Sequence, residues 1–182
     1  NIMDKLFLLD AYALIYRSYY AFMKSPRINS KGLNTSCVMG FCNTLNEILT
    51  KEKPTHIAVA FDHGKTFRHE AFPAYKAQRE ETPEDIKHSV PIIKNILEAY
   101  HIPILQVDGF EADDIIGTVA IQAGEKGIET YMLTPDKDYG QLVRDNVYMF
   151  RPRHGGGYEK LGVEEIEEKY SIASPLQVID LL

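Results

Sequence analysis

The stretch PILQVDGFEADDIIG, residues 103–117, passes from an apolar run through Asp108 and Gly109 into the start of an apolar helix. A short apolar run followed by a helical pattern is typical of one strand–helix unit of an α/β sheet. Three carboxylates, Glu111, Asp113 and Asp114, lie within four positions at this junction. Acidic residues are common in a first helical turn, where they offset the helix dipole, so the stretch alone does not require a functional site.

Comparable apolar runs recur along the chain and alternate with helical patterns. The expected strands are residues 5–9, 56–61, 103–107, 128–133 and 146–150. The expected helices are residues 11–22, 33–52, 82–100, 111–124, 139–143, 163–170 and 175–182, and the glycine-rich residues 151–158 predict a flexible turn or hairpin. This alternation predicts an α/β fold, a doubly wound and mainly parallel sheet flanked by helices on both faces.

The composition is that of an ordinary globular chain, with 182 residues of which 45% are hydrophobic. No apolar run approaches the roughly 20 residues that cross a bilayer, and no leader pattern precedes the first expected strand, so we expect a cytoplasmic protein. Cys37 and Cys42 lie five positions apart on one expected helix. They are poorly placed for a disulfide and too few for a zinc cluster, and we expect them to be core thiols.

Carboxylates follow each of the first four expected strands. They are Asp10, Asp62, the trio Glu111, Asp113 and Asp114, and the pair Asp136 and Asp138. The carboxyl ends of parallel strands share one edge of the sheet, where such folds bind ligands. Clustered carboxylates are unfavourable without a cation, and oxygen ligands without Cys or His favour Mg²⁺ or Mn²⁺. The pattern predicts a two-metal site that cleaves phosphodiester bonds.

Each acid also has a purely structural alternative. Asp10 and Asp62 can be helix or loop caps, Asp136 can form an Asx turn, and Asp138 can cap the helix expected at Tyr139. These alternatives, taken singly, do not explain why four successive strand ends carry acids.

The net charge of −6 argues against a uniformly basic nucleic-acid binder, but the basic residues concentrate between positions 65 and 79. Cations mixed with aromatic rings suit single-stranded nucleic acid, because the cations neutralise phosphates and the rings stack on bases. Lys76 and Arg79, if helical, would face one phosphate, and Arg17 on the first expected helix could reach the same edge. The alternative for the segment is a solvated surface loop with a few buried rings, of which Tyr75 could be one, and the alternative for Arg17 is a surface charge.

Five segments stand in order along the chain: LLDAYALIYRSYYAF, AVAFD, FRHEAFPAYKAQR, GFEADDIIG and LTPDKDYGQLV. Together they resemble the 5′ nuclease domain at the N-terminus of bacterial DNA polymerase I, which is related to flap endonucleases. The resemblance implies a PIN-like 5′ nuclease fold, two divalent cations (Mg²⁺ or Mn²⁺), and 5′-3′ exonuclease and structure-specific flap endonuclease activity. It implies that a monomer, working at the bacterial nucleoid, acts on DNA with a 5′ single-stranded flap or an RNA-primed 5′ end in replication and repair. The parent protein would also be a DNA-directed DNA polymerase.

The resemblance also implies roles for particular residues. Asp10, Asp62, Glu111 and Asp113 would hold the first metal, and Asp113 or Asp114 with Asp136 and Asp138 would face the second. A basic helical arch that admits the 5′ strand would correspond to about residues 64–94. Within it Lys76 and Arg79 would be catalytic, contacting the scissile phosphate, with Tyr75 near the terminal nucleotide and with Arg17 and Arg68 on neighbouring phosphates.

The sequence departs from the family pattern at its end. Such domains continue with a Gly-Asp-x-x-Asp-Asn segment that supplies further ligands to the second metal, and then with a helix-hairpin-helix. We therefore expect residues 1–182 to be a truncated catalytic domain with an incomplete second metal site and weak cleavage. Two other classes stay open: a non-catalytic module that binds branched DNA, and a haloacid-dehalogenase-like phosphatase with Asp10 as nucleophile, although Tyr12 replaces the second Asp of that family's DxD pair. A stand-alone 5′ nuclease is also possible.

Overall fold

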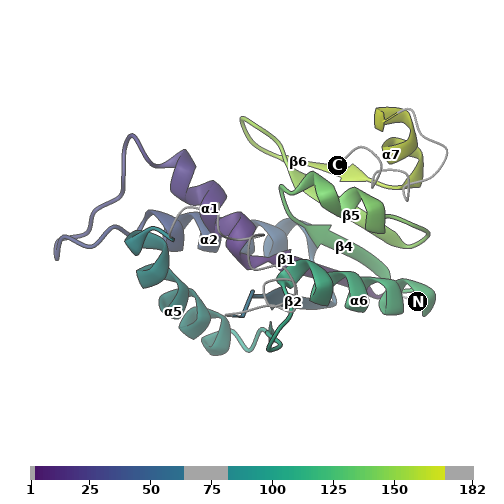
Figure 1. Cartoon of the computed structure of the whole chain (residues 1–182), viewed down its shortest axis with the longest axis horizontal. Helices are drawn as coiled ribbons and strands as arrows, with labels where there is room; N and C mark the ends of the chain where they lie inside the picture. Colours follow the sequence, from purple (N-terminus) through teal and green to yellow (C-terminus); the bar gives the residue numbers. More distant parts are fainter. Residues whose placement is uncertain (1–2, 64–81, 171–182) are drawn as a thin grey trace.

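The structure, a computed structural model, describes residues 3–63 and 82–170 (Figure 1). Its strands are β1 (Lys5–Asp10), β2 (His56–Ala60), β3 (Ile104–Leu105), β4 (Glu129–Leu133), β5 (Val147–Pro152) and β6 (Tyr158–Leu161). Its helices are α1 (Ala11–Ala21), α2 (Ser36–Glu47), α5 (Glu84–Ala99), α6 (Ala112–Glu125) and α7 (Val163–Tyr170). A π-helical turn, η1 (Ile48–Glu52), follows α2, and a 3₁₀ helix, η2 (Lys137–Leu142), follows β4.

The strands form one six-stranded sheet in the order β3-β2-β1-β4-β5-β6. The first five are parallel to their neighbours, and β6 pairs antiparallel with β5. The chain therefore starts in the middle of the sheet, builds outward to β3, and then crosses to the other side of β1 to add β4 and β5. The predicted α/β class with a mainly parallel sheet is confirmed.

Both faces of the sheet are covered. On one face Phe7 and Leu9 of β1 pack with buried residues of α1, α2 and α5. On the other face Leu8 packs with Ile116 of α6 and Ile166 of α7. In Figure 1, α1, α2 and α5 form one group while α6 lies along β4. A strand buried on both sides carries a continuous apolar sequence, which is why the first two strands are easy to recognise.

Two strands differ from the expectation. β3 has only two residues, Ile104–Leu105, in place of the expected 103–107. β6 follows the glycine-rich turn and was not expected as a strand, although the predicted hairpin is present because β5 and β6 pair across it. Gly155, Gly156 and Gly157 have φ angles of 90°, 115° and 76°, a region that strongly favours glycine, and this explains their presence in the turn.

The expected helix over residues 33–52 is also different in detail. α2 begins at Ser36 and changes into the π-helical turn η1 after Glu47, and Lys53 ends it with a left-handed φ of 47°. η2 begins at Lys137, two residues before the expected start. The helix expected over residues 175–182 lies outside the described residues. None of the helices within the described residues is both long and apolar enough to cross a membrane.

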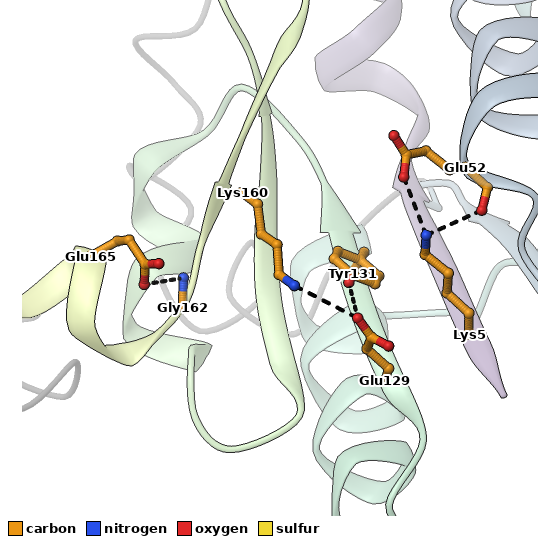
Figure 2. A network of polar contacts seen from close by, with 7 residues as sticks. All are labelled: Lys5, Glu52, Glu129, Tyr131, Lys160, Gly162 and Glu165. Carbon is orange, nitrogen blue, oxygen red and sulfur yellow. Dashed lines mark hydrogen bonds and ion pairs between the residues drawn. The ribbon is translucent and has the colours of Figure 1, made fainter. Parts of the chain in front are cut away.

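Polar contacts connect side chains near the edge of the sheet at which the parallel strands begin (Figure 2). Lys5 pairs with Glu52 at 3.2 Å, while Glu129 accepts a hydrogen bond from the Tyr131 hydroxyl and pairs with Lys160 at 3.6 Å. Cys37 is a buried core thiol, as predicted, whereas Cys42 is only half-buried, and both thiols are free. The predicted acids collect at the opposite edge of the sheet, where the parallel strands end: β1 ends at Asp10, and Asp62 follows β2.

Candidate metal centre

Asp10 ends β1 and is the N-cap of α1. Its Oδ1 atom accepts a hydrogen bond from the Ala13 N–H at 3.4 Å. Its Oδ2 atom accepts from the Thr134 hydroxyl at 3.3 Å and from the Tyr139 hydroxyl at 3.0 Å. The structural alternative is therefore correct as far as it goes, since Asp10 is a cap. Capping accounts for one of these three bonds, and the other two fix a carboxylate that is only 7% exposed.

The carboxyl group of Asp10 is hard to ionise without a cation. Burial, together with the negative charge of Asp62, raises its pKa from 3.8 to about 7, in spite of the lowering effect of the Tyr139 hydrogen bond. A buried carboxyl that faces a second carboxyl is stable as an anion only when positive charge lies beside it. This electrostatic demand fits a bound divalent cation.

Asp62 follows β2 and is held against the start of α6. Its Oδ1 atom accepts a hydrogen bond of 2.6 Å from the N–H of Ala112, the first residue of that helix. Its backbone carbonyl accepts from Gln106 at 3.0 Å, and the Gln106 amide oxygen accepts from Lys94 at 2.9 Å. Because the first N–H groups of a helix have no partner within it, Ala112 can fix this side chain at the helix start.

Glu111, Asp113 and Asp114 lie together at the N-terminus of α6. One carboxylate oxygen of each lies within 4.8 Å of the others. Glu111 is the buried N-cap, and its N–H donates to Asp114 Oδ2 at 3.1 Å. The Asp113 Oδ1 atom accepts from the Asp114 N–H at 2.9 Å. Three hard oxygen donors at this spacing can hold a divalent cation, and oxygen ligands are those that Mg²⁺ and Mn²⁺ prefer.

Asp136 and Asp138 belong to the segment after β4. Asp136 caps η2, and its Oδ1 atom accepts from the Asp138 N–H at 3.0 Å, as the Asx-turn alternative proposed. Asp138 lies in the first turn of η2 and not at its cap, so that alternative for Asp138 was wrong. Burial, followed by the charge of Asp136, raises the pKa of Asp138. A cleft of about 290 Å³ between α6 and η2 is lined by Asp113, Asp114, Asp138 and Tyr139, among others.

The predicted ligands therefore reach one edge of the sheet but not one tight cluster. Within the described part of the chain, the only group of three or more acids close enough to share an ion is that of Glu111, Asp113 and Asp114. The charge of Asp62 acts on Asp10, and Asp138 lines the cleft beside α6. Tyr139 lies among them, since it bonds Asp10 and lines the same cleft as Asp113 and Asp138. Burial, followed by the charges of Asp10, Asp113 and Asp136, raises the pKa of its phenol.

The predicted basic residues are only partly visible. Arg17 is exposed on α1, and its Nη2 atom donates to the Arg153 carbonyl at 3.3 Å, in the turn between β5 and β6. Arg68, Tyr75, Lys76 and Arg79 lie outside the described residues. Of the predicted arch, residues 82–94 are described, and most of them form the first part of α5, whose Ile86 and Ile93 are fully buried.

Three further residues contact the predicted ligands without having been predicted: Gln106, Thr134 and Tyr139. Lys94 is linked to Asp62 only through Gln106. Thr134 and Tyr139 flank the acids of the LTPDKDYGQLV segment. This position next to predicted ligands is the one feature of the sequence that indicates a role for them. Their partner Asp10 is 124 and 129 residues away in sequence. From the sequence alone, a tyrosine in a short helix is expected to be a core residue, and the Tyr139 ring is buried.

Known proteins are similar to this chain in both sequence and fold. The chain is 41% identical over 180 residues to DNA polymerase I of Bacillus caldotenax and 35% identical over 181 residues to the 5′-3′ exonuclease of Aquifex aeolicus. The matches include 97% and 99% of this chain, but only 20% and 61% of the two relatives. The chain thus spans about a fifth of the length of the polymerase.

The fold resembles that of the bacteriophage T5 flap endonuclease. A T5 structure co-crystallized with metal ions matches with a TM-score of 0.72 and 19% identity, covering 97% of this chain and 65% of the other. A second, in complex with DNA and metal ions, matches with a TM-score of 0.68 and 20% identity over 97% and 64% of the two chains. The family model described as "5′-3′ exonuclease, N-terminal resolvase-like domain" matches residues 5–171. On this match and the sequence identities, the chain belongs to the family of 5′-3′ exonuclease N-terminal resolvase-like domains.

Proposed function

We propose that this chain is a metal-dependent 5′-3′ exonuclease and structure-specific 5′-flap endonuclease domain. The observation that carries the proposal is the convergence of acids from separate strand ends. Hydrogen bonds join Asp10 after β1 to η2, and Asp62 after β2 to the start of α6, beside the three carboxylates of Glu111, Asp113 and Asp114. Membership of the 5′-3′ exonuclease family supports the same conclusion.

We propose that Asp10, Asp62, Glu111 and Asp113 hold one divalent cation, and that Asp113 or Asp114 with Asp136 and Asp138 face a second. Bound Mg²⁺ or Mn²⁺ would supply Lewis acidity and lower the pKa of water. The chain's own part is to hold the anionic ligands in place: Ala112 fixes Asp62, and Tyr139 and Thr134 fix Asp10. The similar fold of a T5 protein that was crystallised with metal ions supports this assignment.

We propose that the substrate is DNA with a 5′ single-stranded flap or an RNA-primed 5′ end. Residues of about 64–94 would form a basic arch in which Lys76 and Arg79 contact the scissile phosphate, Tyr75 the terminal nucleotide, and Arg68 a neighbouring phosphate. Arg17 on α1 would contact another. Cations with interspersed rings in this segment support the assignment, as does the T5 complex with DNA.

The relatives favour two settings for the domain. Similarity to DNA polymerase I supports a nuclease that works beside a polymerase in the same bacterial protein, in replication and repair. Similarity to the Aquifex aeolicus 5′-3′ exonuclease, of which the chain covers 61%, supports a nuclease without a polymerase. Both settings use the same site.

Cleavage of a labelled 5′-flap duplex in Mg²⁺, with a 3′-flap duplex as the comparison substrate, tests the proposal. We expect 5′-flap cleavage that EDTA abolishes and that Glu111→Gln reduces by at least about 100-fold, the effect of losing several kcal/mol of transition-state stabilisation. Glu125→Gln, an exposed position at the other end of α6, is the matched control and should cleave normally. Flap binding without metal-dependent cleavage would instead identify a DNA-binding module.

A further inference from the structure

The buried hydroxyl of Tyr139 is bonded to a predicted metal ligand. The Tyr139 side chain is 2% exposed, and its hydroxyl donates to Asp10 Oδ2 at 3.0 Å. The Thr134 hydroxyl donates to the same oxygen at 3.3 Å. Burying a hydroxyl is unfavourable unless it is hydrogen-bonded, and a phenylalanine would fill the same apolar space. The tyrosine hydroxyl therefore needs an explanation beyond packing.

The two hydroxyls act on one oxygen of the carboxylate. A carboxylate oxygen accepts about two hydrogen bonds, so Oδ2 of Asp10 is saturated by Tyr139 and Thr134. Oδ1 accepts from the Ala13 N–H at the longer distance of 3.4 Å and keeps further capacity. Two donors on one side also fix the rotation of the carboxylate about its Cβ–Cγ bond. The asymmetry leaves Oδ1 as the oxygen that a cation can use.

We infer that Tyr139 is a positioning residue for the metal centre: with Thr134, it holds Asp10 so that Oδ1 is presented to a divalent cation. The inference rests on the proposed function, since it assumes that Asp10 binds metal. Tyr139 acts through Asp10 and is not itself a ligand. It also links two strand ends, because η2 follows β4 whereas Asp10 ends β1.

Adjacent residues of η2 serve different purposes in this arrangement. Both Asp138 and Tyr139 line the cleft beside α6, but Asp138 is exposed, whereas most of Tyr139 is buried in the core cluster that contains Leu8 and Ile116. A shift of η2 would therefore move an acid of the cleft and the support of Asp10 together. Partners that orient ligands in this way commonly contribute about 10- to 100-fold to metal affinity.

Calorimetric titration with Mn²⁺ tests the inference. Tyr139→Phe keeps the ring and removes the hydroxyl, and we expect its Mn²⁺ affinity to fall by about 10-fold. Thr134→Val should weaken binding in the same direction. Tyr131→Phe is the matched control, because the Tyr131 hydroxyl also donates to a carboxylate, that of Glu129 (Figure 2). Glu129 lies at the start of β4, away from the strand ends that carry the proposed metal ligands. Its affinity should stay within twofold of that of the unsubstituted chain.

The outcomes separate this inference from the proposed function. If the unsubstituted chain binds Mn²⁺ and Tyr139→Phe binds it equally well, Tyr139 is only a packing residue and the metal centre stands. If Tyr131→Phe weakens binding as much as Tyr139→Phe, the effect is general loosening and the positioning role is rejected. If the unsubstituted chain does not bind Mn²⁺, the proposed metal centre fails, and the role of Tyr139 with it.

Discussion

The charge on Asp10 makes the stability of the metal-free protein depend on pH. Because burial and Asp62 raise the pKa of this carboxyl to about 7, the folded state binds a proton between pH 3.8 and 7 that the unfolded state has lost. Stability therefore falls as pH rises through this interval, and the full cost is present above pH 7. A shift of about 3 pKa units corresponds to at most about 4 kcal/mol.

Asp10→Asn removes this cost. In EDTA, we expect its free energy of unfolding, relative to the unsubstituted chain, to be higher at pH 8 than at pH 5 by about 1–4 kcal/mol. Urea denaturation at the two pH values measures the difference. Asp4→Asn, at an exposed carboxyl one strand length away, is the control. An Asp10→Asn difference that is the same at both pH values would contradict the electrostatic account.

The gathering of the predicted acids at one edge of the sheet followed from the sequence, whereas the side chains that hold them in place did not. Asp10 and Asp62 each follow an apolar run, and the geometry of a parallel sheet brings such positions to one edge. Tyr139 and Gln106 act through contacts made only after the chain has folded, since Gln106 reaches the Asp62 carbonyl across 44 residues. No local pattern encodes a hydroxyl or amide that is buried by tertiary packing.

At the level of helices, the close approach of α1 and α2 depends on Gly40. A Cβ atom at this position would lie 2.3 Å from Ser18 Oγ and 2.6 Å from Ser18 Cβ. Serine has no long side chain that could move aside, so the helices would have to separate. Overpacking costs about 1–3 kcal/mol, more than the gain of up to about 1 kcal/mol from replacing a helical glycine by alanine.

We therefore expect Gly40→Ala to lower the free energy of unfolding by about 1–2 kcal/mol. Gly117→Ala in α6 is the matched control, since its Cβ would meet only the ends of the flexible Leu142 side chain, at 3.3 Å. It should be close to neutral. Thermal or urea unfolding of both variants measures the contrast. Equal effects at the two glycines would mean that the α1–α2 contact is not as tight as the structure indicates.

Elements buried on both sides were the most predictable ones. β1, β2 and β4 have continuous apolar sequences and were expected within about one residue of their observed bounds. β6, with the sequence YEKL, lies at the sheet edge and has no such run. The change from α2 to a π-helical turn was missed for a similar reason, because Ile48 and Leu49 continue the apolar pattern while the backbone changes.

The whole domain should become more stable when the proposed centre binds a cation. A ligand at 100 times its Kd adds about 2.7 kcal/mol, and about 2–4 °C of Tm per kcal/mol is typical at this chain length. We expect saturating Mn²⁺ to raise the Tm by about 5–10 °C, measured by thermal unfolding with and without EDTA.

Substitutions at the α6 start should change that shift selectively. Asp113→Asn, within the carboxylate group, should remove much of the Mn²⁺ effect. Asp108→Asn, an exposed acid five residues earlier that pairs with His63, should leave it intact. A shift that persists in Asp113→Asn and is lost in Asp108→Asn would place the cation elsewhere.

The bond between Asp10 and Tyr139 has a further consequence for the order of events during synthesis. It joins residues 129 positions apart, while the bond between Asp62 and Ala112 spans 50. A chain emerging from the ribosome folds from its N-terminus, at about 5–20 residues per second. β1 and β2 therefore emerge well before the residues that complete the site. The proposed centre can assemble only after translation has passed η2, so the early nascent chain has the first ligands but no site that could cut nearby nucleic acid.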